Sequence, residues 1–119
     1  MGEREMRKIA MTVAGAALLV GAGLATAPGA QAATPCPSGA VCIRETNGTI
    51  LSKNIFYSYG AHNLSNVTGY RVVVNSQTGG AGFQECLGYN GTNCSPVYRA
   101  TGDYAAIDYT PINSLVLVP

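Results

Sequence analysis

Two patterns of apolar residues divide the chain into a short N-terminal part and a longer C-terminal part. Residues 9–27 are almost wholly apolar and carry no charge. Beyond Cys36, the apolar residues form short runs, rich in Val and Tyr, which are separated by Gly, Asn, Ser and Pro. Such runs, which lack a helical period, predict β-strands joined by turns. We therefore expect an all-β domain after a segment of a different kind.

The expected strands have a composition that favours a half-buried pleated surface. Tight turns are expected at Asn47-Gly48 and Asn90-Gly91, because Asn-Gly is favoured in short hairpin turns. The apolar runs that predict strands are residues 40–44, 55–59, 70–74, 82–89, 97–99, 105–109 and 114–118.

The N-terminal segment has the layout of a cleavable export signal, which we assign to residues 1–32. Basic residues precede the apolar run, Pro28 ends it, and Ala30 and Ala32 place small residues where signal peptidase requires them. An uncleaved signal anchor is the alternative, since the run comes close to the ~20 residues that span a bilayer. We expect cleavage after Ala32, which leaves residues 33–119 as one secreted, extracellular domain at the small end of what folds alone.

The charge of the expected mature domain argues against two classes of partner. Residues 1–32 contain three of the seven Lys and Arg residues and two of the six Asp and Glu residues, so residues 33–119 carry four of each. Nucleic acids and anionic membranes both bind clustered Lys and Arg, which this part of the sequence lacks. We expect a monomer that neither binds nucleic acid nor stays associated with a membrane after cleavage.

Four cysteines, Cys36, Cys42, Cys86 and Cys94, all follow the expected cleavage site. An even number of cysteines in an exported chain indicates disulfides. Sequence alone leaves three pairings open, and the grouping into two close pairs favours Cys36–Cys42 and Cys86–Cys94. Zinc is the alternative, but the spacings differ from those of zinc knuckles and the chain has one histidine, His62. We expect no metal and no cofactor.

A weak internal repeat runs through the C-terminal part. Cys42 and Cys86 are 44 positions apart, the two Asn-Gly-Thr turns are 43 apart, and residues 69–74 stand 44 before residues 113–118. A common offset predicts two similar four-stranded units. Chance similarity among Val-rich strands is the alternative.

The motifs of residues 33–119 follow a distinctive order: Cys-Pro-Ser-Gly-Ala-Val-Cys at 36–42, a glycine-rich middle, a second local cysteine pair, and Asn-Ser-Leu-Val at 113–116. In this order they resemble the Streptomyces metalloproteinase inhibitor family. The resemblance implies a small exported bacterial protein with a βγ-crystallin-like fold, in which two Greek-key motifs pack as a β-sandwich. Crystallin-like domains often bind calcium, but the corresponding stretches here, 65–70 and 109–114, lack the paired acids or amides, and hard cations need several oxygen ligands. We expect no calcium site.

Enzymatic chemistry has weak support in the sequence. His62 lies in a polar stretch and is expected in a solvated loop, because no nucleophile-elbow motif accompanies it. Asp103 and Asp108, with Glu85, could form a glycosidase pair, but we interpret them as isolated surface acids. No cysteine is left over as a nucleophile, so we predict that the protein is not an enzyme.

The resemblance places the inhibitory bond after the first cysteine of the second pair, between Cys86 and Leu87, in a loop that continues through Gly88 and Tyr89 to Cys94. Thermolysin-type zinc proteases seat a bulky apolar residue just after the scissile bond, and Leu87 is such a residue. A Cys86–Cys94 bridge would hold the ends of a clipped loop together and lower the ordering cost of binding. The alternative is a plain hairpin whose Leu87 points into the core.

We therefore predict an inhibitor of extracellular metalloproteases. The alternatives are a crystallin-like toxin or a cell-surface or carbohydrate-binding module, for which an aromatic patch away from the loop is expected, and a structural coat protein. The seven tyrosines form either a recognition surface or part of the core, and Tyr89 and Tyr98 are the ones expected to be exposed. Asn-x-Ser/Thr sequons, interpreted as turn asparagines, begin at Asn47, Asn63, Asn66, Asn90 and Asn93.

Overall fold

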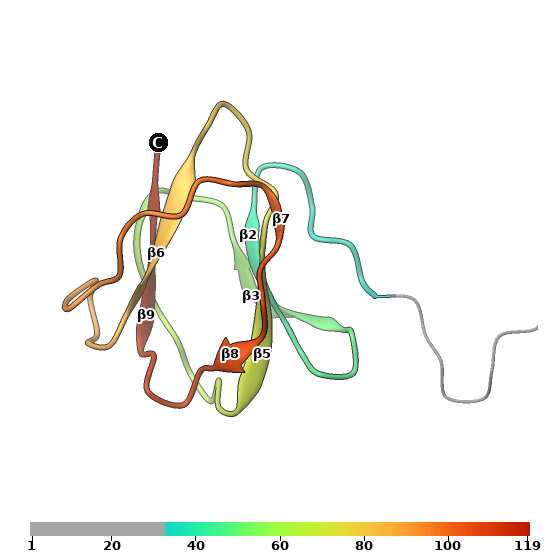
Figure 1. Ribbon diagram of the computed structural model, residues 1–119, viewed down its shortest axis with the longest axis horizontal. Helices are drawn as coiled ribbons and strands as arrows, with labels where there is room; N and C mark the ends of the chain where they lie inside the picture. The colour runs from blue at the N-terminus through green and yellow to red at the C-terminus, as the bar shows by residue number, and fades with distance from the viewer. Residues whose placement is uncertain (1–32) are drawn as a thin grey trace, which may run out of the picture. The chain divides into compact units, whose positions relative to one another are not determined.

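Residues 33–119 are described by a computed structural model, in which two antiparallel β-sheets enclose one apolar core (Figure 1). The expected export signal, residues 1–32, lies outside the described residues. The described part is all-β, which confirms the expected all-β class. Among these residues, no helix is long and apolar enough to cross a membrane.

The first sheet is built around β2 (Val41–Arg44), which lies between β3 (Ile50–Phe56) and β5 (Tyr70–Asn75). β5 also pairs with two short strands, β7 (Gly102–Asp103) and β8 (Ile107–Asp108). The apolar residues of β2 and β5 supply one wall of the core.

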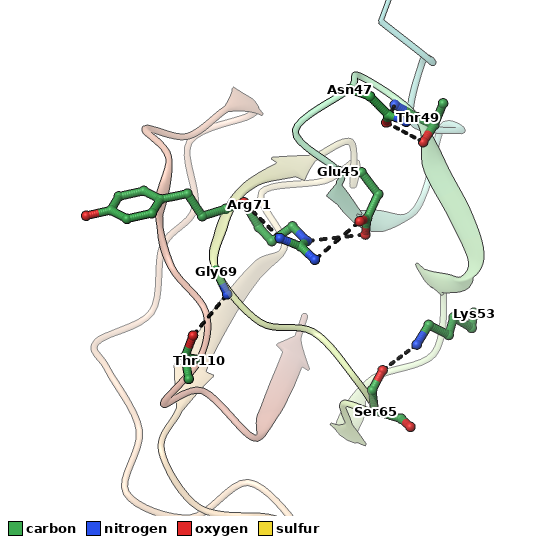
Figure 2. A network of polar contacts seen from close by, with 9 residues as sticks. Glu45, Asn47, Thr49, Lys53, Ser65, Gly69, Arg71 and Thr110 are labelled. Carbon is green, nitrogen blue, oxygen red and sulfur yellow. Dashed lines mark hydrogen bonds and ion pairs between the residues drawn. The ribbon is translucent and has the colours of Figure 1, made fainter.

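Polar contacts hold one end of the first sheet together (Figure 2). Gly48 has a φ of 90°, and the Asn47 Oδ1 atom accepts hydrogen bonds from the Thr49 N–H (3.1 Å) and hydroxyl (2.7 Å), which confirms the tight turn between β2 and β3. Beside this turn, the Arg71 guanidinium of β5 forms an ion pair of 3.2 Å with Glu45. This pair joins the end of β5 to the end of β2.

The second sheet has three strands in the order β4 (Gly60–Asn63), β9 (Ser114–Val118) and β6 (Gly82–Cys86). Along β9, Leu115 and Leu117 are buried in the core, while Val116 and Val118 between and after them are half-buried. This alternation follows from the two-residue period of a strand.

The strands β2–β5 form the first half of the domain and β6–β9 form the second, and each half contributes a strand to the sheet of the other. β4 follows β3 along the chain but pairs with β9, and β7 belongs to the later half but pairs with β5. Beside β6, the segment that follows Cys94 contributes a single β-bridge, between Tyr98 and Phe83. Each half therefore completes the sheet of the other.

The expected repeat is present in the strand pairs but not in the positions of the cysteines. β2 pairs with β5 so that Cys42 lies opposite Val74, whereas β6 pairs with β9 so that Cys86 lies opposite Ser114. A strict repeat of 44 would place Cys86 opposite Val118, which instead faces Gly82. The equal spacing of the two cysteines is therefore not a structural equivalence.

Several strand predictions need correction. β3 begins five residues before the expected run 55–59 and ends at Phe56, and β6 ends at Cys86 rather than at residue 89. Residues 97–99 form one bridge only, and 105–109 shorten to β8. The edge strands β4 and β7 were not predicted, because main-chain pairing with a neighbour forms them and their side chains show no apolar alternation.

The Cys36–Cys42 disulfide covers the outer face of the first sheet. Side chains alternate along a strand, so Val41 and Ile43 face the core while Cys42 faces away from it. Cys42 is nevertheless completely buried. The Cys36 sulfur lies 3.9 Å from the Val74 carbonyl oxygen, which places the N-terminal segment over this face.

A buried amide network ties the end of β5 to two later segments. The two N–H groups of Asn75 Nδ2 are shared among the carbonyl oxygens of Ala81 (3.3 Å), Arg99 (3.4 Å) and Ala100 (3.2 Å). Its Oδ1 atom accepts from the Gln77 side-chain amide at 3.1 Å. Because Asn75 is buried, these bonds satisfy an amide that water cannot reach.

Candidate functional site

The loop of residues 86–94, which we call the cysteine loop, is a tight hairpin that follows β6. The Cys86–Cys94 disulfide closes its base, with the two Cα atoms 3.9 Å apart. At its tip, Asn90 (φ 60°) and Gly91 (φ 72°) are both left-handed, as a type I′ turn requires at its two central positions. The expected local disulfides and the Asn-Gly turn are confirmed.

Two glycines allow the cysteine loop to close. A Cβ atom on Gly88 would collide with the Thr92 hydroxyl across the hairpin, and one on Gly91 would lie 2.8 Å from a Val116 methyl group of β9. The Gly88 N–H donates to the Thr92 carbonyl at 3.0 Å. The two sides of the hairpin therefore lie in close contact with each other, and the tip of the loop lies in close contact with the second sheet.

Leu87 is the apolar residue that the cysteine loop presents to solvent. Leu87 is 50% exposed and Tyr89 is 56% exposed, whereas Cys86, the last residue of β6, is completely buried. The alternative hairpin, with Leu87 in the core, is not the arrangement that the structure shows.

Two asparagines outside the cysteine loop hold its backbone. The main-chain N–H of Asn113 donates to the Cys86 carbonyl (2.9 Å), and its side-chain Nδ2 donates to the Leu87 carbonyl (2.8 Å). From β4, the Asn63 amide accepts from the Asn90 N–H (2.7 Å) and donates to the Asn90 side chain (3.0 Å). Sequence analysis did not predict these roles, since the partners lie 26 and 27 positions apart and no local pattern relates them.

Ser114, at the start of β9, fixes the inner side of the loop. Its completely buried hydroxyl donates to the Gly88 carbonyl at 2.6 Å and accepts from the Gly91 N–H at 3.0 Å. The cysteine loop is thus held by a disulfide at its base and by hydrogen bonds from β4, Asn113 and β9.

A polar pocket of about 290 Å³ lies beside the loop, with Tyr89 and Asn113 in its wall. Its other lining residues are 64–68, Thr110 and Ile112. Apart from Leu64, they come from the two stretches, 65–70 and 109–114, that the resemblance relates to calcium binding. These stretches lie side by side, because the Gly69 N–H donates to the Thr110 hydroxyl at 2.9 Å (Figure 2). Within residues 33–119, no three His, Cys, Asp or Glu side chains gather in a way that could hold a metal ion.

His62 lies in β4 and not in the solvated loop that we expected. Its ring packs 5.0 Å from that of Phe56, and its Nε2 atom lies 2.7 Å from the Ser58 carbonyl oxygen. Pairing of His62 with Leu115 draws this polar stretch into the second sheet.

The three acids considered for glycosidase chemistry have separate partners. Asp103 forms an ion pair of 2.6 Å with Arg44, and the Asp108 carboxylate accepts from the Thr110 N–H at 2.9 Å. Hydrogen bonds from the side chain and backbone of Thr110 lower the pKa of Asp108. Glu85 instead contacts the hydroxyl of Tyr109.

Glu85 is not the surface acid that we expected. It lies two positions after Phe83, on the same inward face of β6, and is half-buried. Burial raises the pKa of Glu85, and the hydrogen bond from the Tyr109 hydroxyl partly opposes this. Burial, and then the adjacent Glu85 carboxylate, raise the pKa of Tyr109, which is completely buried.

The tyrosines divide between core and surface. Tyr89 is exposed, as expected, but the expectation for Tyr98 is wrong, because its ring packs against Phe83 (5.5 Å between centroids) and Tyr104 (5.8 Å). Outside the cysteine loop, Tyr57 and Tyr59 are 59% and 58% exposed. They lie in the connection between β3 and β4.

Comparisons of this chain with protein-family models, with curated protein sequences and with solved structures each find no match. The function is therefore proposed from the geometry of the cysteine loop and from the motifs of the sequence.

Proposed function

We propose that residues 33–119 are a secreted inhibitor of extracellular metalloproteases and that the cysteine loop enters the protease. The observation that carries this proposal is the half-exposed Leu87 on a backbone held by the Cys86–Cys94 disulfide, Asn113 and Ser114. A loop that is ordered before binding loses little conformational entropy in the complex. Leu87 offers the bulky apolar side chain that suits the subsite of a thermolysin-like enzyme.

The strand order supports a βγ-crystallin-like fold made of two Greek-key motifs. In a Greek key, the fourth strand returns to lie beside the first. β5 lies beside β2, and β9 lies beside β6. β4 of the first motif pairs with β9 of the second, and β7 of the second motif pairs with β5 of the first. The two motifs therefore form one core. This arrangement supports the resemblance to the Streptomyces inhibitor family, with a monomer as the working unit.

Secretion is supported by the two disulfides, because such bonds persist in oxidising compartments. The export signal proposed for residues 1–32 would deliver the chain to that environment.

An inhibition assay tests the proposal. The chain is expressed in full in an exporting host, and the secreted product is titrated against thermolysin and, as the specificity control, against the serine protease subtilisin. We expect inhibition of thermolysin and none of subtilisin. A product that inhibits no metalloprotease would refute the proposed function.

A surface-binding module is the second candidate, because exposed aromatic residues Tyr57 and Tyr59 lie outside the cysteine loop. Aromatic side chains supply large, rigid contact areas for recognition. If the secreted product is inert against metalloproteases but sediments with insoluble polysaccharide, and the double variant Tyr57→Ala/Tyr59→Ala does not sediment, this second function is favoured.

A further inference from the structure

We infer that Asn113 keeps the Cys86–Leu87 bond uncut, so that the cysteine loop binds a protease as an intact ligand and not as a slowly cleaved substrate. This inference rests on the proposed function, since it assumes that the loop is presented to a metalloprotease. It assigns Asn113 a positioning role, exerted through the backbone of the two residues that form the bond.

The backbone polar groups on both sides of the bond are already hydrogen-bonded within the protein. The Cys86 and Leu87 carbonyls both accept from Asn113, through its main-chain N–H (2.9 Å) and its side-chain Nδ2 (2.8 Å). The Leu87 N–H donates to the Asn93 carbonyl at 3.0 Å, and the Gly88 carbonyl accepts from the Ser114 hydroxyl at 2.6 Å. A substrate strand would need such groups free to pair with the protease.

Hydrolysis requires movements that these contacts oppose. A zinc-activated water adds to the Cys86 carbonyl carbon while the metal polarises the carbonyl oxygen. The C–N bond then breaks, which leaves a carboxylate on Cys86 and an amine on Leu87 that takes up a proton. In the folded protein, the Cys86 carbonyl oxygen accepts a hydrogen bond from the Asn113 N–H, and Cys86 is completely buried. The activated water can therefore attack this bond only if the segment detaches from Asn113.

The side chain of Asn113 is the part of this contact that mutation can remove. Asn113→Ala and Asn113→Asp both delete the Nδ2 donor, and the aspartate retains the shape of the side chain. Asn63→Ala is the matched control, because it removes two hydrogen bonds to the loop at Asn90 but none at the Cys86–Leu87 bond. The control separates a specific effect on this bond from a general loosening of the loop.

The experiment exposes the folded, exported protein and each variant to thermolysin, a zinc protease that cleaves before bulky apolar residues. Reduction followed by mass spectrometry measures cleavage between Cys86 and Leu87, and inhibition is recorded in the same samples. We expect wild type to stay intact and both Asn113 variants to be cut at this bond about tenfold faster, roughly the effect of one hydrogen bond.

Two results would overturn the inference: equal resistance of wild type and the Asn113 variants, or equal acceleration in Asn63→Ala. Faster cleavage throughout the chain, with a lower melting temperature, would indicate a merely structural role and would also count against it. The proposed function fails separately. If wild type does not inhibit but only the Asn113 variants are cut at this bond, the protective contact stands and the inhibitor proposal falls.

Discussion

Replacement of Leu87 by alanine separates an anchoring role from a structural one. Full burial of a leucine side chain is worth ~1.5–3 kcal/mol, and Leu87 is 50% exposed in the free protein. About half of that free energy, ~0.8–1.5 kcal/mol, is therefore gained only when a protease covers the side chain. At 1.4 kcal/mol per factor of ten, Leu87→Ala should raise the inhibition constant by roughly four- to twelvefold. Loss of close packing in the enzyme pocket would increase this effect.

The measurements are an inhibition constant against thermolysin and a melting temperature, both on the same variant. Leu51→Ala is the matched control, since Leu51 is 44% exposed on β3, outside the cysteine loop. Both variants should lose at most ~1.5 kcal/mol of folding stability, or roughly 6–12 °C in melting temperature for a domain of this size. Only Leu87→Ala should weaken inhibition. Equal inhibition constants for the two variants, or a Leu87→Ala protein that is strongly destabilised but inhibits normally once folded, would remove Leu87 from the mechanism.

Three further predictions concern stability. Because burial raises the pKa of Glu85, its contribution is most favourable below its ordinary pKa and declines as pH rises through the higher folded value. The melting temperature of Glu85→Gln minus that of wild type should therefore increase from pH 4 to pH 7. A difference that does not change with pH would contradict this reasoning. Asn75→Ala leaves buried carbonyls without a donor and should cost ~2–3 kcal/mol, measured by denaturant unfolding; a loss within experimental error would show that water replaces the amide. Calcium at millimolar concentration should leave the melting temperature unchanged relative to chelator, because stretches 65–70 and 109–114 lack paired acids or amides; a rise of several degrees would reveal a site.

The short-range features of the domain could be predicted from sequence because they depend on neighbouring residues. Val-rich runs predicted β2, β5 and β9, since β-branched side chains favour the pleated conformation wherever they are buried. At the Asn90-Gly91 turn both residues adopt the left-handed conformation that Asn and Gly tolerate, and at the turn after β2 Gly48 adopts it. The close spacing of the cysteines likewise favoured the local disulfides.

The other features of the fold and of the cysteine loop depend on contacts between segments that are distant in the sequence. β4, with no apolar period of its own, becomes a strand because β9 supplies hydrogen-bonding partners, and this pairing moves His62 out of a loop. Glu85 turns inward because it shares a face of β6 with Phe83. The cysteine loop itself was visible in the sequence, but its rigidity depends on Asn63 and Asn113, which reach it across the fold. Hydrogen bonds between residues so far apart leave no periodic or local trace in a sequence, so only the tertiary structure shows how Leu87 is held.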